Sequence, residues 1–389
     1  MTRYNEIVDI LHNASNMAYV IGNGINNHYF SEFILNWKDL LSKLWKDNCG
    51  ENIEIPQGIT YTEFFDLIEL NSFYNKTFDL ERKTLLTLRD LPNQLRREYK
   101  NLLSLRIDKL SNENYSEFIK NDTFFMDDSR EFCKSIREDA DELSAIDCVN
   151  YLINTISDRT KLNLYRNKIK KDVVDRYKCI EKELNNSEYS LLLESIKRSG
   201  CPILTTNFDI LMSRSLNLKM YKMGDNFTDY YPWNVYFSEN EYSNPNENFA
   251  IWHINGIINY HRSIKLGLSD YMGCVERARR MLQGKDLIEY FNGKNQNNWS
   301  GYNTWMHIIF NKNLFIFGLS LDENEVFLRW LLIQRAKYSK MYNKDLKGWY
   351  IDYNISKGKR FFLEQINFIV IELNDVKEFD LLYKAISER

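Results

Sequence analysis

Three short, mainly apolar runs in this chain are each followed directly by a turn of small and polar residues. The runs cover residues 17–21, 201–204 and 313–317, so they lie far apart in the sequence. Runs of this length that end in Gly, Thr or Asn are typical of strands buried on both faces. Ligands collect at the carboxyl ends of the strands in an open α/β sheet. The three turns therefore predict one shared nucleotide site.

The remaining pattern predicts an α/β fold. Further short apolar runs lie at 250–252, 349–351 and 368–372. Helical spacing of apolar residues occurs at about 4–13, 30–45, 208–217, 269–288, 300–312, 323–340, 357–366 and 376–387. Strands that alternate with helices of this length predict a Rossmann-like, mostly parallel sheet with helices on both faces.

The region between the first two strands differs in texture from the rest. From 62 to 199 helical periodicity and dense charge dominate, glycine is absent, and residues 127–141 are notably acidic. We therefore expect residues 1–61 and 200–389 to form the α/β domain and 62–199 to form an inserted helical subdomain, with 127–141 as an exposed helical face. The insertion is interpreted as a lid, as an oligomerisation subdomain or as a simple enlargement of the core.

Composition excludes several functional classes. A net charge of −3 offers no global attraction for nucleic acid, and the six cysteines never approach C-x-x-C spacing, which argues against a zinc module. No apolar run approaches the roughly 20 residues needed to span a bilayer. Scattered cysteines without an apolar N-terminal signal segment predict a cytoplasmic protein with reduced thiols and no bound metal.

The turn after residues 201–204 carries the densest polar chemistry. Thr205, Thr206, Asn207 and Asp209 place hydrogen-bonding side chains at a strand end. The amide of Asn207 can bind a ribose hydroxyl. Alternatively, Asn207 is the N-cap of a helix at 208–217, and Asp209 is a first-turn charge that favours the helix dipole.

Two glycine turns offer close backbone approach to a phosphate. Gly22, Asn23 and Gly24 follow the first strand, and Gly318 and Ser320 follow the third. The third glycine of the dinucleotide fingerprint and a Gly-Lys-Ser/Thr sequence are both missing, so neither an ordinary dehydrogenase nor a P-loop enzyme fits. Ser320 is equally consistent with a helix N-cap.

His253 is the histidine best placed to reach the strand-end cleft. It closes the run at 250–252, and an unperturbed pKa of about 6.5 suits a general base near neutral pH. Asn255 and Gly256 follow it and add an amide and a close backbone approach. The alternative is a structural histidine. His28, just past the first glycine turn, is a second histidine near the same site.

Taken together and in this order, four segments resemble the sirtuin-like NAD-binding domain family: residues 22–26, 205–209, 253–256 and 318–320. Residues 263–267, followed by Asp270 and Tyr271, resemble what bacterial members carry after the His segment. The resemblance implies NAD⁺ as the bound substrate, with Asn207, His253 and Asp209 as catalytic residues. The nucleotide-binding residues it implies are Gly22, Asn23, Gly24, Ile25, Asn26, Thr205, Thr206, Asn255, Gly256, Gly318 and Ser320.

Two departures from the family refine the expected activity. Deacylating sirtuins carry four zinc-binding cysteines and a His directly before Gly, whereas this chain lacks the cysteines and reads His-Ile-Asn-Gly. Asn255 lies nearer the family position of the His, but His253 remains the predicted base because an amide cannot accept a proton. The missing cysteines favour the bacterial branch that hydrolyses NAD⁺ in phage defence.

We therefore expect an NAD⁺ glycohydrolase that acts as an abortive-infection effector. The resemblance implies regulation by homo-oligomerisation or by a HerA-type hexameric ATPase, with no membrane or direct nucleic-acid partner. A non-catalytic sensor of NAD or ADP-ribose is the alternative from a different functional class. An NAD-dependent protein deacylase is disfavoured by the missing cysteines.

Overall fold

The computed structural model of the protein describes residues 3–30, 36–50, 52–75, 158–181, 184–224 and 227–388. The chain divides into a main unit, which comprises Met1–Lys46, Asn52–Asp66 and Val173–Arg389, and a second unit of Asp47–Glu51 and Leu67–Asp172. The acidic segment 127–141 lies outside the described residues. In the second unit, Glu69 on α4 (Tyr61–Asn75) forms an ion pair with Arg166 on α9 (Asp158–Glu181).

The main unit is built on one eight-stranded sheet, and the predicted α/β class is confirmed. The strands are β1 (Met17–Ile21), β2 (Ile203–Thr205), β3 (Lys219–Lys222), β4 (Val235–Ser238), β5 (Ile251–His253), β6 (Asn313–Phe317), β7 (Gly348–Tyr353) and β8 (Phe368–Leu373), in the order β3-β4-β5-β2-β1-β6-β7-β8. The six strands β5-β2-β1-β6-β7-β8 are parallel to one another. β3 pairs antiparallel with β4, and β4 pairs antiparallel with β5. The sequence did not reveal β3, which is largely exposed and has a lysine at each end, or β4.

Helices precede, connect and follow the strands. They are α1 (Arg3–Asn13), α2 (Gly24–Phe30), α3 (Trp37–Cys49), α10 (Ser187–Arg198), α11 (Leu211–Ser215), α12 (Leu268–Met281), α13 (Lys285–Phe291), α14 (Trp305–Ile309), α15 (Val326–Met341), α16 (Lys357–Gln365) and α17 (Phe379–Ser387). Within the described ranges, no helix is long and apolar enough to cross a membrane.

Several predicted helices have different bounds, and the helix expected at 300–312 shrinks to α14. The helix expected at 30–45 is replaced by α2, which begins at Gly24, and by α3. The helix expected at 269–288 divides at Gly284, whose φ of 126° lies outside helical backbone. The helix expected at 208–217 shrinks to α11, because Asp209 and Ile210 belong to the loop that leaves β2.

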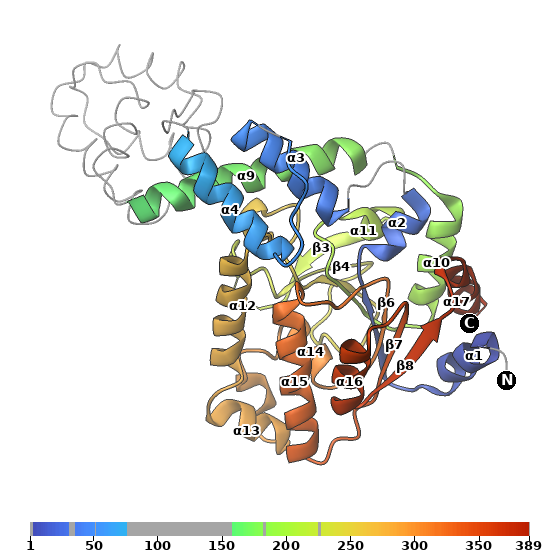
Figure 1. Ribbon diagram of the computed structural model, residues 1–389. Coiled ribbons are helices and arrows are strands. Elements are labelled where there is room, and N and C mark those ends of the chain that lie inside the picture. The colour runs from blue at the N-terminus through green and yellow to red at the C-terminus, as the bar shows by residue number, and fades with distance from the viewer. Residues whose placement is uncertain are drawn as a thin grey trace, which may run out of the picture. The chain divides into compact units, whose positions relative to one another are not determined.

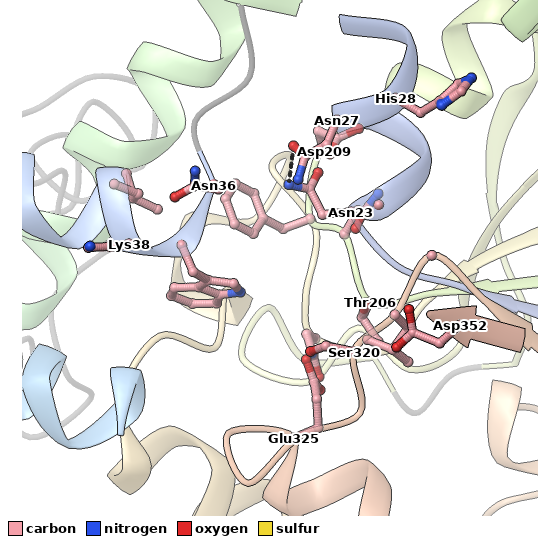
Figure 2. Close-up of a pocket in the computed structure, with 18 of the residues that line it drawn as sticks. Asn23, Asn27, His28, Asn36, Lys38, Thr206, Asp209, Ser320, Glu325 and Asp352 are labelled. Carbon is pink, nitrogen blue, oxygen red and sulfur yellow. Dashed lines mark hydrogen bonds between the residues drawn. The ribbon is translucent and has the colours of Figure 1, made fainter. Parts of the chain in front are cut away.

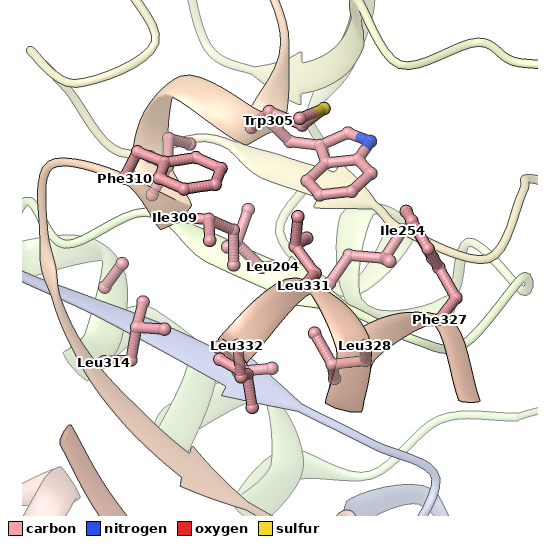
Figure 3. Packing of buried hydrophobic residues seen from close by; sticks show 14 of the residues in the cluster. Leu204, Ile254, Trp305, Ile309, Phe310, Leu314, Phe327, Leu328, Leu331 and Leu332 are labelled. Atoms are coloured by element: carbon pink, nitrogen blue, oxygen red, sulfur yellow. The ribbon is translucent and has the colours of Figure 1, made fainter. Parts of the chain in front are cut away.

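Strand alternation divides the core of the main unit into two clusters, one on each face of the sheet. Val20, Leu204 and Trp252 belong to the cluster that α12, α14, α15 and α16 cover, part of which Figure 3 shows. Ile21, Ile203 and Ile251 belong to the cluster that α1, α10, α11 and α17 cover. The two sets of helices lie on opposite sides of the sheet (Figure 1). Both faces are therefore buried, and the ends of the strands are left for a ligand.

Candidate functional site

A cavity of about 590 Å³ lies at the carboxyl ends of the central parallel strands (Figure 2). This volume falls within the range of small-molecule and cofactor sites. Eight of the predicted site residues line it: Asn23, Gly24, Thr206, Asn207, Asp209, Asn255, Gly318 and Ser320. Gly22, Ile25, Asn26, Thr205, His253 and Gly256 are not among the described residues that line it. The structure thus brings together segments from four strand ends.

The two glycine turns pack directly on each other. Gly24 N–H donates to the carbonyl of Gly318 at 2.7 Å, and a Cβ at Gly22 would lie 2.5 Å from the same oxygen. Gly318 has a φ of 63°, which side chains rarely adopt. The space beside Gly22 and Gly24 is therefore filled by the neighbouring turn. Their small size lets β1 and β6 end together under the cavity.

Asn207 is not a helix cap. The helix after β2 begins at Leu211, with Ile210 in the capping position. Asn207 is 7% exposed, and its Nδ2 has no hydrogen-bond partner among the residues described. An unpaired buried amide is costly, so this donor is available to a ligand that enters the cavity.

Asp209 combines the two roles that the sequence left open. Its Oδ1 accepts from the N–H of Leu211 at 3.1 Å, in the first turn of α11, while its Oδ2 accepts from Asn26 Nδ2 at 3.1 Å. Asn26, in turn, accepts from the hydroxyl of Tyr189 at 3.0 Å. Burial raises the pKa of Asp209 to about 6, although the hydrogen bonds from Leu211 and Asn26 oppose this rise. Asp209 is therefore largely ionised at neutral pH on the wall of the cavity.

His253 lies beside the loop that carries Asn207. It pairs in register with Thr205 on β2, and both side chains point to the same face of the sheet as Ile251. Its Nδ1 lies 2.7 Å from the backbone oxygen of Asn207, and since a carbonyl only accepts, Nδ1 carries the proton. Burial lowers the pKa of His253 to about 4, so the ring is neutral at physiological pH.

The side chain of Thr205 also stabilises the loop that carries Asn207. Its hydroxyl donates to the carbonyl of Ile21 at 3.0 Å and accepts from the N–H of Asn207 at 3.1 Å. Gly256 has a φ of 96°, and a Cβ there would lie 2.2 Å from the carbonyl of Ser263. Both residues support the site without being among its described lining residues.

Glu325 is a lining residue that the sequence analysis missed. It follows β6 by eight positions and precedes α15, where a glutamate resembles an ordinary first-turn charge. It is 9% exposed, and burial together with the charge of Asp322 raises its pKa to about 7. A hydrogen bond from the side chain of Asn255 opposes this rise. Ser320, which the sequence allowed as a cap, donates to Asp322 at 3.1 Å instead.

The outer walls of the cavity are aromatic and charged. Trp37, Tyr61, Tyr177 and Tyr383 line it together with His28, whose Nε2 lies 3.2 Å from the carboxylate of Asp380. In Figure 2, Asn23, Asn27 and Asp209 lie along the upper part of the view, and Ser320 and Glu325 lie below them. The mixture of rings, amides and carboxylates suits a polar ligand that also carries flat rings.

Neither metal ligation nor known relatives identify the site. No group of three or more His, Cys, Asp and Glu side chains that could hold a metal ion occurs in the part of the chain that the structure describes. A search against protein-family models finds no match for this chain, and a search of curated proteins finds no significant relative. The motifs and the geometry of the cavity are therefore the features that bear on function.

Proposed function

We propose that the protein is an NAD⁺ glycohydrolase, which cleaves NAD⁺ with water to nicotinamide, ADP-ribose and a proton on a Rossmann-like domain. The observation that carries this proposal is the unpaired Nδ2 of Asn207, a residue that lines the same cavity as the carboxylate of Asp209. Four motifs that resemble one NAD-binding family supply the strand ends around that cavity. The aromatic walls suit the flat rings of a dinucleotide.

Hydrolysis of NAD⁺ needs few catalytic groups from the protein. Nicotinamide leaves NAD⁺ as a neutral molecule, so its departure needs no general acid. The transition state at the ribose is oxocarbenium-like, as in glycoside hydrolysis. The protein has to orient the ribose, hold a water on the face opposite the leaving group and accept one proton from that water.

The lining residues suggest a division of labour. Asn207 Nδ2 orients the ribose or the attacking water by donating to an oxygen. Asp209, with a pKa of about 6, is ionised above that pH and accepts the proton as the water attacks. His253 then acts as a positioning residue, since its Nδ1–H holds the backbone of Asn207. Gly24, Gly318 and Ser320 supply the surface for the remainder of the nucleotide.

Release of nicotinamide from NAD⁺ by the purified full chain tests the proposal. Asn207→Ala and Asp209→Asn are each expected to lower turnover roughly 100-fold or more, in line with losses of positioning and of general-base catalysis. Glu276→Gln, an exposed change on α12, is the matched control and should leave turnover unchanged. Turnover that survives both substitutions would contradict the proposal.

A non-catalytic sensor of NAD or ADP-ribose is the second candidate. Two observations favour it: both oxygens of Asp209 already accept hydrogen bonds, and His253 is not among the described lining residues. Saturable binding of ADP-ribose with no nicotinamide release, alone or with a co-purified partner, would support the sensor.

The cellular role is proposed from the resemblance alone. An enzyme that depletes NAD⁺ has to be restrained until infection. We propose restraint by homo-oligomerisation or by a HerA-type ATPase, with abortive infection as the outcome. NAD⁺ levels in infected cells that carry the wild type or Asn207→Ala test this role, and equal levels would contradict it.

A further inference from the structure

Asn255 and Glu325 are two buried polar side chains on the cavity wall. Each has hydrogen-bonding capacity that no described residue uses. The two residues come from different strand ends, Asn255 two positions after β5 and Glu325 eight positions after β6. They are 5% and 9% exposed, so both are removed from bulk water. The two side chains are close enough that the Asn255 amide opposes the rise that burial causes in the pKa of Glu325.

Each member of the pair keeps one oxygen without a partner. Asn255 Oδ1 and Glu325 Oε2 accept no hydrogen bond from any described residue. Both residues line the same cavity, so the two vacant oxygens belong to neighbouring side chains of one wall. Buried acceptors of this kind are costly unless a donor reaches them.

Two neighbouring oxygens that accept no hydrogen bond restrict the chemical groups that can bind to them. Two neighbouring acceptors match two neighbouring O–H donors, and the cis-2,3-diol of a ribose presents such donors. Each hydroxyl retains lone pairs, so it can also accept from Asn207 Nδ2 across the same cavity. A phosphate fits poorly, because it brings negative charge to a carboxyl that already lies near Asp322.

We propose that Asn255 and Glu325 form a diol-binding subsite that accepts the two hydroxyls of one ribose of the ligand. This inference rests on the proposed nucleotide site and adds the group that the ligand must carry there. Glu325 is a binding residue in this scheme. It forms no covalent bond and transfers no proton. The shared chemistry is a ribose diol, which either ribose of NAD⁺ can supply.

Isothermal titration calorimetry of the full chain tests the subsite at pH 8, where Glu325 is ionised in view of its pKa of about 7. The probes are ADP-ribose, which has no nicotinamide to release, and its two derivatives that lack the 2-hydroxyl on one or the other ribose. For one derivative, Kd should rise roughly 10- to 100-fold, as expected for losing a hydrogen bond to a charged acceptor. The derivative that is affected identifies the ribose.

Measuring the effect of the missing hydroxyl in variants of the protein separates the subsite from a general loss of binding. In the variant at the residue that accepts this hydroxyl, either Glu325→Gln or Asn255→Ala, its removal should change Kd less than about threefold, because the partner is already altered. Glu276→Gln should retain the full penalty. Equal penalties in the wild type and both subsite variants, or no penalty in the wild type, would overturn the subsite.

Failure of the subsite and failure of the proposed function give different results. ADP-ribose that binds without preference for the hydroxyls overturns the subsite and leaves the nucleotide site intact. If ADP-ribose does not bind, ribose 5-phosphate and 2-deoxyribose 5-phosphate are compared. Preference for the former then supports the subsite and rejects the proposed function. If none of the five probes binds, both are rejected.

Discussion

The ends of β2 and β5 lie side by side in the sheet, yet they use their polar residues differently. After β2, the loop sends Thr206, Asn207 and Asp209 to the cavity. At the end of β5, His253 turns to the buried face and holds that loop, and the first lining residue is Asn255. The position of a polar residue at a strand end therefore does not settle its role. Strand alternation decides which side chains face the ligand and which ones support them.

The largest effect that we expect is on the rate of nicotinamide release, in variants of Asn207 and His253. Asn207→Ala should lower nicotinamide release roughly 100-fold or more, because the donor that orients the ribose is lost. His253→Asn places an amide where Nδ1–H lies, so the bond to the backbone of Asn207 can be kept while the Nε2 lone pair is removed. We expect His253→Asn to retain turnover within about tenfold.

The same pair of variants can also contradict the roles assigned to Asn207 and His253. A loss of about 100- to 10,000-fold in His253→Asn, with an unchanged melting temperature, would identify His253 as the general base. The contrast between a lining asparagine and a supporting histidine would then be wrong.

The second effect concerns the pH dependence of stability. The folded-state pKa of Glu325, about 7, exceeds its ordinary value of 4.5, so its favourable contribution is fully present below pH 4.5 and is lost as pH rises through 7. Glu325→Gln removes this loss. Relative to the wild type, the variant should gain up to about 3 kcal/mol in free energy of unfolding between pH 5 and pH 8.

Urea unfolding of both proteins at the two pH values measures this gain. The titration of Asp209 is common to both proteins and cancels in the difference. His253 titrates in the opposite sense, since its lowered pKa of about 4 costs stability only as pH falls below its ordinary 6.5. A constant difference between wild type and Glu325→Gln would contradict the buried, ionisable carboxyl.

A third effect tests how the glycine turn under the cavity is built. A Cβ at Gly22 would meet backbone atoms of Gly318 and Leu319 at 2.5 and 2.8 Å, so Gly22→Ala should cost about 1–3 kcal/mol of stability. Gly358→Ala on α16 is the control, because nothing lies within 4 Å of its added Cβ. It should raise stability by up to about 1 kcal/mol through helix propensity. Thermal unfolding of both variants would show equal shifts if the turns do not pack as described.

The smallest effect separates two neighbouring threonines. Thr205→Val removes two hydrogen bonds that hold the Asn207 loop, so we expect a loss of about 1–2 kcal/mol of stability. Thr206→Val changes a lining hydroxyl and should leave stability within about 0.5 kcal/mol while weakening ADP-ribose binding. The reverse assignment of the two effects would show that alternation does not sort this strand end.

The sequence by itself determined the α/β class and the strand ends around the cavity. Runs of buried residues in 17–21, 203–205 and 313–317 are local signals, and the polar turns behind them are contiguous with the strands. Asn207 and Asp209 were therefore recognisable as cavity residues before any contact was known. The strands β3 and β4 were not recognised, and β3 lacks the buried apolar run that marks the central strands.

Only the tertiary structure decided how the side chains divide between lining and support. The register of β2 with β5 turns His253 toward the backbone of Asn207, and the packing of one turn on another explains Gly22. Glu325 becomes distinctive because burial and Asp322 shift its pKa, and neither cause is visible in a local sequence pattern. Residues distant in the chain create these environments together, so their chemistry belongs to the fold and to no single motif.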